Sequence, residues 1–574
     1  MEKARNRRIN YMLGGEMVHS ESGKRYLSLV AVAIALLMFT GAHAVQRAAP
    51  ASDDQDYTAI EGKIVEDFQA ALTVAKANYA GAIDLDKVAT ASIDGMLKTL
   101  DPHSSYFDRK AWQDFQAEQR STYSGIGSVI SPHNGKVYIF SPFDHTAAYK
   151  AGLFYGDQII AIDGESAAGW GVAQVQKHLL GPSGTQVTVK VARDGVAEPL
   201  EFKLTRGSVP TPSIATSFVV GNGVGYIGMQ GGFNMTTAEE FSRDLKDLHS
   251  EKVSSLIIDL RGNRGGLVEQ AYRVINNFLY AGQRIVLMKG RSGVFPTSDL
   301  RARNTQPDQS PIVVLIDGGS ASAAEIVAAA LQDHDRAILV GDNSFGKGLV
   351  QTPYTLRDGS GLILTQGKYY TPSGRLIQRD YSGRSFYDYY LQRGDKEALE
   401  KQPREEKHTD SGRAVYGGEG INPDTVAKVP PSYIELIRTW NDPVFAFTRD
   451  LIAGQIPELP EFKIERPADH GHVLSDSDYV VDDKVLAVFK KFLNEHKDIK
   501  APDAAHFQRD AEFLKIRIRS EVVTAACGQE VAYQVLLKGD PQMQAALAQM
   551  PMARKMEDSF LHMATAKAAT RPGN

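Results

Sequence analysis

The sequence predicts a multidomain protein that combines the α+β and α/β fold classes, and three observations support this prediction. The chain has 574 residues, which is enough for several domains at about 150 residues each. Residues 123–205 hold short β-rich runs separated by Gly, Pro and Asp, a pattern typical of a small β-rich domain. Residues 223–427 alternate continuous apolar runs with helical patterns, as expected for a sheet that is covered on both faces.

Composition and charge narrow the classes of function. Hydrophobic residues make up 43% of the chain and charged residues 23%, so there is enough apolar material for several buried cores. The formal net charge of -5 argues against a nucleic-acid binder that neutralises phosphates. Cys527 is the single cysteine, which excludes an intrachain disulfide framework and a cysteine-rich metal site. We interpret Cys527 as a small apolar side chain on a helix.

The N-terminal residues 1–44 are typical of a secretory signal peptide. Basic residues precede the apolar run 26–40, and a small-residue pattern that ends at Ala44 follows it. The run is shorter than the roughly 20 residues that a membrane-spanning helix needs, and the pattern matches a cleavage site. We expect cleavage after Ala44 and a mature chain in the periplasm or cell envelope. An uncleaved anchor is the alternative, and translation begins at Met1 or at Met17.

Residues 55–118 show helical spacing of apolar side chains and are predicted to form an N-terminal helical segment. The pattern breaks at residues 100–106, because Pro102 disfavours a helical conformation in the residue before it. His103 lies in this break. We interpret it as a hydrogen-bonded structural residue, with a catalytic role as the alternative.

Residues 119–206 are predicted to form one domain, with short strands and a helix at 170–180. The order of elements resembles a PDZ domain, and the residues that carry the resemblance are Ser124-Gly125-Ile126-Gly127, Ala151-Gly-Leu153, Gly156-Asp157, Ile162-Asp-Gly164 and Gly181-Pro-Ser-Gly-Thr185. Backbone N–H groups of a glycine loop can receive a terminal carboxylate, and the edge strand after the loop can accept an added peptide strand. We therefore expect the loop of Ser124, Gly125, Ile126 and Gly127 to bind a peptide C-terminus. The alternative is that the two glycines serve a tight turn.

The region 210–430 is predicted to form the α/β core, followed by a helical extension at 431–574. Residues 391–416 are polar and are predicted to form an exposed loop. The strands expected in the core lie at 225–228, 256–260, 312–316, 337–340 and 362–364, and the helices at 237–248, 267–279 and 323–333.

Two segments of this core carry candidate catalytic residues. Residues 317–325 leave a buried strand, pass through two glycines and enter a helix, with Ser322 and Glu325 at the spacing of a capping box. A helix start favours negative charge, as a tetrahedral oxyanion requires. Lys347 stands between two glycines that leave it sterically free, and it can act as a base if burial lowers its pKa from about 10.4 toward 7 to 8. Gln351 could hold the lysine amine by hydrogen bonding.

Taken together, these segments resemble the carboxyl-terminal processing peptidases, a serine-lysine peptidase family related in fold to ClpP and crotonase. The resemblance rests on the PDZ-like domain and on the motifs Leu100-Asp-Pro-His-Ser-Ser-Tyr106, Asp259-Leu-Arg-Gly-Asn-Arg-Gly-Gly266, Ser320-Ala-Ser-Ala-Ala-Glu325, Phe345-Gly-Lys-Gly-Leu-Val-Gln351 and Tyr369-Tyr-Thr-Pro-Ser-Gly374. It implies a ClpP/crotonase-like protease core with an inserted PDZ domain. It also implies Ser322 as the nucleophile, Lys347 as the general base and Gln351 as the residue that positions the lysine. Ser320 is the competing nucleophile.

The same resemblance implies an oxyanion hole made by the backbone N–H of Ala323 together with that of Gly265 or Gly266. The choice between the two glycines stays open. Two residues depart from the family pattern. Arg264 stands where many relatives carry Pro, and Leu180 stands where relatives often carry an arginine that couples the PDZ domain to the active site. We expect catalysis to survive the change at Arg264, because Gly265 and Gly266 are kept. The change at Leu180 puts the gating contact in doubt and predicts a PDZ domain that regulates differently or only captures substrate.

The sequence therefore predicts a serine endopeptidase that recognises exposed nonpolar C-terminal tails of envelope proteins and hydrolyses peptide bonds through an acyl-enzyme. The resemblance implies protein substrates with free C-termini and no metal or cofactor. An adaptor protein and a homo-oligomer are further candidate partners, and nucleic acid is not expected. The alternatives are a noncatalytic peptide-binding scaffold, which intact Ser322, Lys347 and Gln351 argue against, and an acyl-CoA enzyme, which export would separate from its substrate.

Overall fold

The structure, a computed structural model, describes residues 57–291, 293–382, 389, 404–464 and 467–569. The predicted signal peptide lies outside the described residues. Within the described part of the chain, no helix combines the length and the apolar character needed to cross a bilayer.

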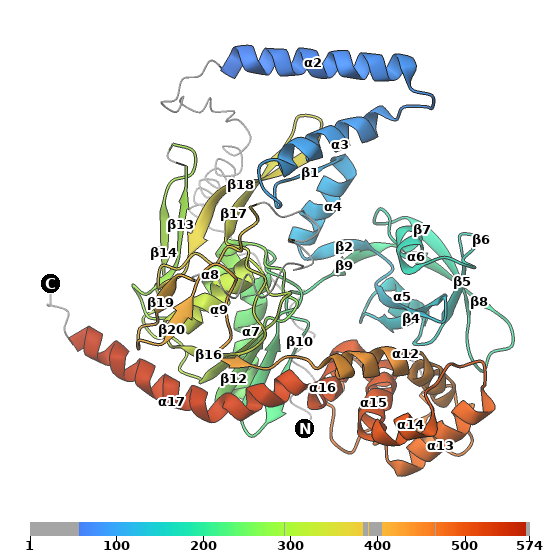
Figure 1. Cartoon of the computed structure of the whole chain (residues 1–574). Coiled ribbons are helices and arrows are strands. Elements are labelled where there is room, and N and C mark those ends of the chain that lie inside the picture. The colour runs from blue at the N-terminus through green and yellow to red at the C-terminus, as the bar shows by residue number, and fades with distance from the viewer. Residues whose placement is uncertain (1–56, 292, 383–388, 390–403, 465–466, 570–574) are drawn as a thin grey trace, which may run out of the picture. The chain divides into compact units, whose positions relative to one another are not determined.

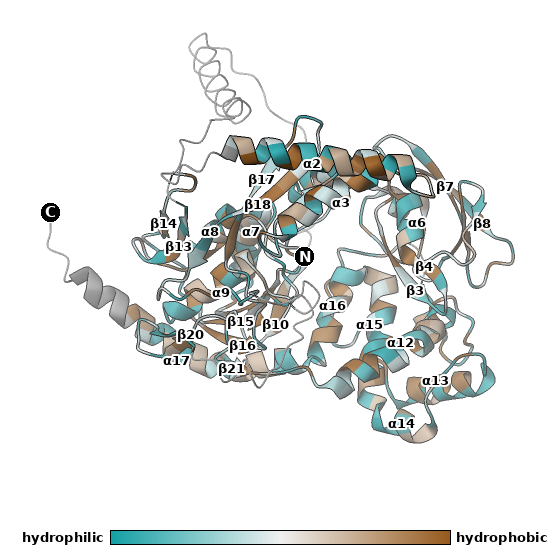
Figure 2. Cartoon of the chain, turned by 45° about the horizontal axis from the view of Figure 1, so that its top comes forward, coloured by the Kyte–Doolittle hydropathy of each residue, from teal (hydrophilic) through white to brown (hydrophobic). Residues whose placement is uncertain are grey.

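Helix α2 (Tyr57–Asn78) belongs to a unit that is compact by itself. Its side chains are mostly exposed, including Ile60, Ile64 and Phe68 at 50%, 61% and 48%. The spacing of these three residues places them on one face of the helix, and Figure 2 shows apolar stretches along α2. The helix expected in this part of the N-terminal segment is confirmed.

The rest of the N-terminal segment contains α3 (Leu85–Lys98), the strand β1 (Ser105–Phe107) and α4 (Arg109–Gln119). The side chains of Asp84 and Asp108 accept backbone N–H groups at the starts of α3 and α4, as expected of N-cap residues. The break in the helical pattern is confirmed, and it holds a strand that the pattern did not predict. Asp101 explains the extended chain, because its carboxylate accepts the N–H groups of His103 and Ser104, each at 2.8 Å.

The next segment forms one antiparallel sheet with the strand order β3-β4-β5-β7-β8, and β6 pairs with β5. Strand β2 pairs instead with β9 (Gly207–Pro210). Helix α6 confirms the predicted helix at 170–180, and its side chains Val175 and Leu179 are buried in the core of this segment. The bounds are β2 (Thr122–Gly125), β3 (Ser128–His133), β4 (Lys136–Pro142), α5 (Ala147–Ala151), β5 (Gln158–Ile162), β6 (Glu165–Ser166), α6 (Val172–Leu179), β7 (Gln186–Ala192) and β8 (Leu200–Thr205).

A six-stranded sheet with the order β10-β11-β12-β15-β16-β21 forms the centre of the following region (Figure 1). Strand β10 is antiparallel to β11, and the other neighbours are parallel. The strands and helices predicted here are confirmed, within a few residues at their ends. The bounds are β10 (Thr216–Gly221), β11 (Val224–Gly228), α7 (Thr237–Ser250), β12 (Ser255–Asp259), α8 (Val268–Ile275), β15 (Ile312–Ile316), α9 (Ala323–Asp333), β16 (Ala337–Gly341) and β21 (Thr425–Val426).

Both faces of this sheet are covered, which explains why its strands are continuously apolar. Ile312 and Val314 belong to the buried cluster that contains the residues of α7, α8 and α9. Val313 and Leu315 point to the other face and pack with residues of α17 (Pro541–Ala569), such as Met550. The second cover of the sheet is therefore supplied by the C-terminal extension.

A second, antiparallel sheet has the order β1-β18-β13-β14, with β17 also paired to β18. Its bounds beyond β1 are β13 (Arg284–Gly290), β14 (Ser298–Arg301), β17 (Leu349–Thr355) and β18 (Gly361–Tyr370). The sequence analysis found a short part of β18 and missed the other strands. In the described part of the predicted polar loop, β19 (Glu406–His408) pairs with β20 (Ala414–Tyr416), so this part is a two-stranded ribbon rather than a plain loop.

Helices form most of the described residues of the C-terminal extension, as predicted, and irregular segments such as 467–482 join them. Residues 513–519 of the extension pack within the chain, since Leu514 and Ile518 are fully buried in a cluster that also holds Tyr155 of the preceding β-rich segment. The hydroxyl of Tyr155 donates to Glu521 Oε2 at 2.7 Å. Besides α17, the helices are α12 (Pro431–Ile452), η1 (Pro460–Phe462), α13 (Asp483–Glu495), α14 (Ala504–Arg509), α15 (Ala511–Cys527) and α16 (Gln529–Lys538).

Candidate active site

Ser322 is the residue immediately before α9, at the point where the chain turns from β15 into this helix. Its backbone has φ 56° and ψ -115°, a conformation that costs a non-glycine residue about 1–3 kcal/mol and often marks a functional site. The residue is half-buried, whereas the α9 side chains that follow it are buried. The turn therefore presents Ser322 at the edge of a rigid core.

Lys347 lies in the loop between β16 and β17, and its side chain is desolvated. Burial lowers the pKa of its ammonium group from the ordinary value, against the charges of Glu325 and Asp101, which raise it. The sequence predicted that the two flanking glycines leave the lysine sterically free, but the loop is closely packed at Gly348. A Cβ on Gly348 would lie 2.9 Å from the backbone nitrogen of Gln378, so this glycine permits close packing of the loop.

The carboxylate of Glu325 connects the segments that carry the two candidate catalytic residues. Its Oε2 accepts the backbone N–H groups of Ser322 and Lys347, each at 2.8 Å. Its Oε1 accepts from the Ser344 hydroxyl at 2.5 Å and from the Gly346 N–H at 2.7 Å. Glu325 is fully buried, and burial raises its pKa while these four hydrogen bonds oppose the rise. The capping-box spacing predicted the contact of Glu325 with Ser322. No sequence signal predicted its three hydrogen bonds with the loop that contains Lys347.

Tyr369, on β18, is a second buried residue that links the same two segments. Its hydroxyl lies 3.1 Å from the carbonyl oxygen of Ser322 and also contacts the carbonyl oxygen of Lys347. Tyr369 belongs to a motif that carries the family resemblance, but no sequence signal predicted these contacts.

The loop of residues 100–106 lies beside the lysine. Gln351 Nε2 donates to the carbonyl oxygen of His103 at 2.7 Å, which fixes the orientation of the Gln351 amide. The pairing of Gln351 with the Lys347 amine stays a prediction. His103 Nε2 lies 2.8 Å from the Tyr389 hydroxyl, and burial together with the nearby charge of Lys347 lowers the pKa of His103 to about 4. The contact with Tyr389 is one that a hydrogen-bonded structural residue makes, and the choice between a structural and a catalytic role of His103 stays a prediction.

The two glycines that the sequence could not separate have different surroundings. The N–H of Gly265 donates to Asn263 Oδ1 at 2.9 Å, so it is already used within its own loop. A Cβ on Gly265 would lie 2.7 Å from Ser322 Cβ and 2.8 Å from the Ala323 nitrogen, so Gly265 allows this close approach. Gly266 is exposed. The geometry thus favours the Gly266 N–H as the second oxyanion donor beside that of Ala323. Gly265 instead allows the two segments to pack closely.

The hydroxyl of Ser320, the competing nucleophile, is buried and hydrogen-bonded within the core. Ser320 is fully buried, and its hydroxyl donates to the Leu260 carbonyl oxygen at 2.8 Å and accepts the Asp317 N–H at 3.0 Å. These contacts occupy the Ser320 hydroxyl, whereas Ser322 is half-exposed at the helix start.

The predicted peptide-binding loop is divided between a strand and a turn. Ser124 and Gly125 belong to β2 and pair with β9, while Ile126 and Gly127 form the turn into β3. Gly127 has φ 79°, and a Cβ there would lie 2.4 Å from Thr146 Cβ. Ser124 Oγ is buried and has no hydrogen-bond partner among the described residues. Strand β3 stands at one end of the strand order, so one of its edges is open to strand addition.

The two departures from the family pattern have distinct settings. Arg264 is exposed, so the loop around Gly265 keeps its contacts without a proline at this position. Leu180 is 37% exposed and lies close to Gly125. Arg206 approaches the same place and donates to the carbonyl oxygen of His178 at 2.7 Å.

Among the described residues, no group of three or more His, Cys, Asp or Glu side chains is arranged to hold a metal ion.

Comparisons with known proteins identify the family to which the chain is similar. Residues 223–383 match Peptidase family S41, and residues 144–193 match the PDZ domain. The Carboxy-terminal-processing protease of Bartonella bacilliformis is 38% identical over 53% of this chain and 70% of its own length. The Carboxy-terminal processing protease CtpB of Bacillus subtilis is 34% identical over 58% of this chain and 69% of its own length. A solved structure of a photosystem II D1 C-terminal processing protease is 28% identical, covers 52% of this chain and 81% of its own, and has a TM-score of 0.32.

The fold and the matches define a peptidase of family S41 that contains a PDZ domain. Within this class, the identity and coverage of the relatives show that the chain belongs to the carboxy-terminal processing proteases.

Proposed function

We propose that the chain is a serine-type endopeptidase with a Ser322–Lys347 dyad. The observation that carries this proposal is the buried Glu325 carboxylate, which accepts the N–H groups of both residues at 2.8 Å. One rigid acceptor therefore fixes the backbone of the nucleophile relative to that of the base. The desolvation that lowers the pKa of Lys347 supports a neutral amine, which is the form that can take a proton from a serine hydroxyl.

The proposed reaction is acyl transfer. Neutral Lys347 takes the proton of the Ser322 hydroxyl as the oxygen attacks the scissile carbonyl, and the N–H groups of Ala323 and Gly266 stabilise the resulting oxyanion. Lys347 then protonates the leaving amine, which leaves an acyl-enzyme on Ser322. Water, deprotonated by Lys347, hydrolyses this ester and restores the hydroxyl. Gln351 is proposed to hold the lysine amine through its amide oxygen, because its nitrogen donates to His103.

The substrates that we propose are proteins with exposed nonpolar C-terminal tails. A tail would add to the open edge of β3, with its carboxylate at the turn of Ile126 and Gly127 and beside the unpartnered hydroxyl of Ser124. We further propose envelope proteins as substrates and an exported location, on the basis of the signal peptide predicted at 1–44.

The finer architecture is proposed on the same grounds. The parallel strands β11, β12, β15 and β16 with α7, α8 and α9 on one face support a ClpP/crotonase-like core at 210–430. The PDZ domain at 119–206 is inserted between this core and the N-terminal helical segment at 55–118, and the extension follows at 431–574. An adaptor that delivers substrates and a homo-oligomer remain proposals that the family resemblance supports.

The test is mass spectrometry of an unstructured reporter with a nonpolar C-terminus, incubated with the purified chain and its variants. Ser322→Ala and Lys347→Ala should each abolish cleavage, and a metal chelator should leave wild-type cleavage unchanged. Ser320→Ala serves as the control, since it should destabilise the fold while retaining measurable cleavage. Cleavage by Ser322→Ala at the wild-type rate, or no cleavage by the wild type, would contradict the proposal.

A further inference from the structure

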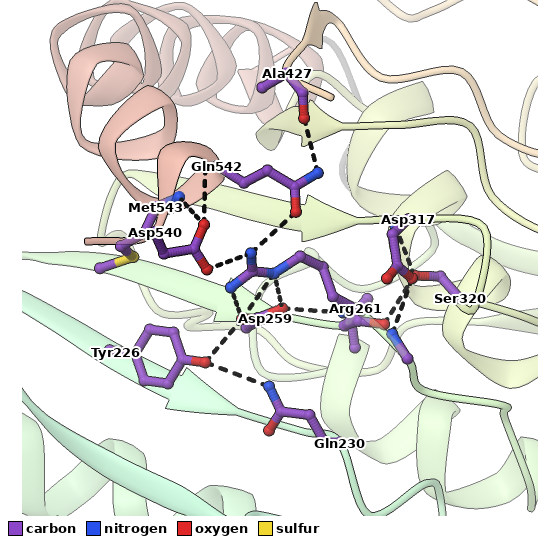
Figure 3. A network of polar contacts seen from close by, with 12 residues as sticks. Tyr226, Gln230, Asp259, Arg261, Asp317, Ser320, Ala427, Asp540, Gln542 and Met543 are labelled. Carbon is purple, nitrogen blue, oxygen red and sulfur yellow. Dashed lines mark hydrogen bonds and ion pairs between the residues drawn. The ribbon is translucent and has the colours of Figure 1, made fainter. Parts of the chain in front are cut away.

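Arg261 begins the loop that contains Gly265 and Gly266, and its guanidinium joins two distant parts of the chain (Figure 3). Its Nη2 donates to Asp259 Oδ2 at 2.6 Å, and its Nη1 donates to Asp540 Oδ2 at 2.6 Å. The Arg261 and Asp540 side chains are 12% and 18% exposed. This ion pair is therefore shielded, unlike exposed pairs that contribute about 0–1 kcal/mol.

Asp259 makes the contact with Arg261 costly to break. Its side chain is fully buried at the end of β12, and its Oδ2 also accepts from the Tyr226 hydroxyl at 2.7 Å. A buried carboxylate is strongly destabilising when its cationic partner is lost. Arg261 is consequently held at this end of β12. It also contacts Asp540, which belongs to the C-terminal extension.

Asp540 stands immediately before α17 and uses its two oxygens for different contacts. Its Oδ1 accepts the N–H groups of Gln542 and Met543 at 2.8 and 3.2 Å, as a helix N-cap does. Its Oδ2 accepts from Arg261. The Gln542 side chain adds a second acceptor for Arg261 Nη1 at 3.0 Å and donates to the Ala427 carbonyl oxygen at 2.7 Å. The start of α17 is thereby fixed against the loop (Figure 3).

Residues beside Arg261 also contact the segment of the candidate nucleophile. The carbonyl oxygen of Asn263 accepts the Ala321 N–H at 2.9 Å, and the Leu260 carbonyl oxygen accepts from the Ser320 hydroxyl at 2.8 Å. Gly265 lies directly against Ala323, since a Cβ there would be 2.8 Å from the Ala323 nitrogen, so a displacement of the loop at Arg261 would change the position of Gly266 relative to Ala323. An oxyanion donor is effective only when it lies within hydrogen-bond distance of the developing charge.

We propose that the C-terminal extension is part of the catalytic apparatus, with Asp540 acting through Arg261 as a positioning residue for the loop that supplies the Gly266 N–H. This inference rests on the proposed function. The substitution that isolates it is Asp540→Asn, because asparagine retains the ability to cap α17 while it removes the negative charge that pairs with Arg261 Nη1. The contacts of Arg261 with Asp259 remain. The expected result is a lower kcat for reporter cleavage with an unchanged KM. Since loss of a complete oxyanion donor lowers kcat by about 10²–10³-fold, we expect a smaller loss of about tenfold.

Two further variants separate positioning from general loosening of α17. Met550→Ala, which removes a side chain that packs α17 against the sheet, should lower Tm without a comparable loss of kcat. In the Asp540→Asn background, Gln542→Glu places a new carboxylate beside Arg261 Nη1 and should recover kcat in part. Gln542→Glu alone is measured as well, since it changes the contact with Ala427.

A readout that does not depend on turnover is amide hydrogen exchange of residues 260–266. Asp540→Asn should accelerate exchange in this loop, and Met550→Ala should not do so selectively. Wild-type kcat and wild-type loop exchange in Asp540→Asn would overturn the inference while cleavage by the wild type and inactivity of Ser322→Ala still support the proposed function. An equal fall of kcat in Asp540→Asn and Met550→Ala would also overturn it. A wild type without peptidase activity contradicts the proposed function, and the exchange measurement then decides the loop contact by itself.

Discussion

The carboxylate of Glu325 accepts the backbone N–H of Lys347 at 2.8 Å, although the two residues come from different segments of the core. The same carboxylate receives the N–H of Ser322. A change at Glu325 therefore alters the relative position of the nucleophile and the base without removing either reactive group.

Glu325→Gln should lower both activity and stability. The glutamine amide offers one acceptor oxygen where four donors now converge, and each buried donor left without a partner costs about 1–3 kcal/mol. We expect kcat for reporter cleavage to fall by more than about tenfold, in line with the sensitivity of catalysis to small displacements, and Tm to fall with it.

The matched control for this change is Glu240→Gln. Glu240 is also buried and accepts the Ile214 N–H at 3.0 Å in the same core, but it contacts neither Ser322 nor Lys347. A similar fall in Tm with kcat retained would attribute the activity loss of Glu325→Gln to the site. Equal kcat losses in the two variants would refute this assignment.

The pH dependence of activity and of stability should both report the lowered pKa of Lys347. Because the base acts as the neutral amine, kcat/KM should rise with pH and level off above this pKa.

For stability, the unfolded chain binds more protons than the folded chain between the lowered pKa and about 10.4, so the free energy of unfolding rises with pH in this window. Lys347→Met should therefore raise Tm at pH 7, and the gain should shrink as the pH approaches 10.4. A Met variant that melts earlier than the wild type at pH 7 speaks against a lowered pKa.

Asp101→Asn should shift the acid limb of kcat/KM to lower pH. The negative charge of Asp101 raises the pKa of Lys347, so its removal lets the lysine lose its proton at lower pH. Asp108→Asn is the control, because Asp108 caps α4 in the same segment and asparagine preserves a cap. The pH profile of Asp108→Asn should match that of the wild type, and an equal shift in both variants would rule out the specific effect of Asp101.

Gly127→Ala should weaken the binding of a peptide with a nonpolar C-terminus, and Gly135→Ala should not. Both glycines have positive φ, 79° and 72°, but a Cβ at Gly127 would lie 2.4 Å from Thr146 Cβ and a Cβ at Gly135 would contact nothing within 4 Å. The two variants share the backbone penalty of about 1–2 kcal/mol for this conformation, so the comparison isolates the shape of the loop. We expect Kd from a fluorescence titration to rise at least about tenfold in Gly127→Ala, equivalent to about 1.4 kcal/mol. Unchanged affinity in Gly127→Ala would place peptide binding elsewhere.

Local sequence signals predicted much of the fold and the identity of the two candidate catalytic residues. The apolar runs at 312–316 and 337–340 were predicted as strands because sheets covered on both faces bury every residue of such strands. Ser322 and Lys347 were found because each follows such a strand in a glycine-containing turn. Strand β1 was missed since three residues at the edge of a sheet leave almost no periodic signal, and its pairing with β18 depends on a distant part of the chain.

By itself the sequence predicted many of the strands and helices and indicated Ser322 and Lys347 as candidate catalytic residues, because these signals depend on neighbours along the chain. Only the structure shows that the Asn263 side chain accepts the Gly265 N–H, which is the contact that favours Gly266 in the proposed oxyanion hole. It also decided that α17 covers the second face of the central sheet and that Asp540 reaches Arg261. The contacts of α17 with the sheet and of Asp540 with Arg261 join residues hundreds of positions apart, and they form only when packing of the apolar faces has brought the segments together.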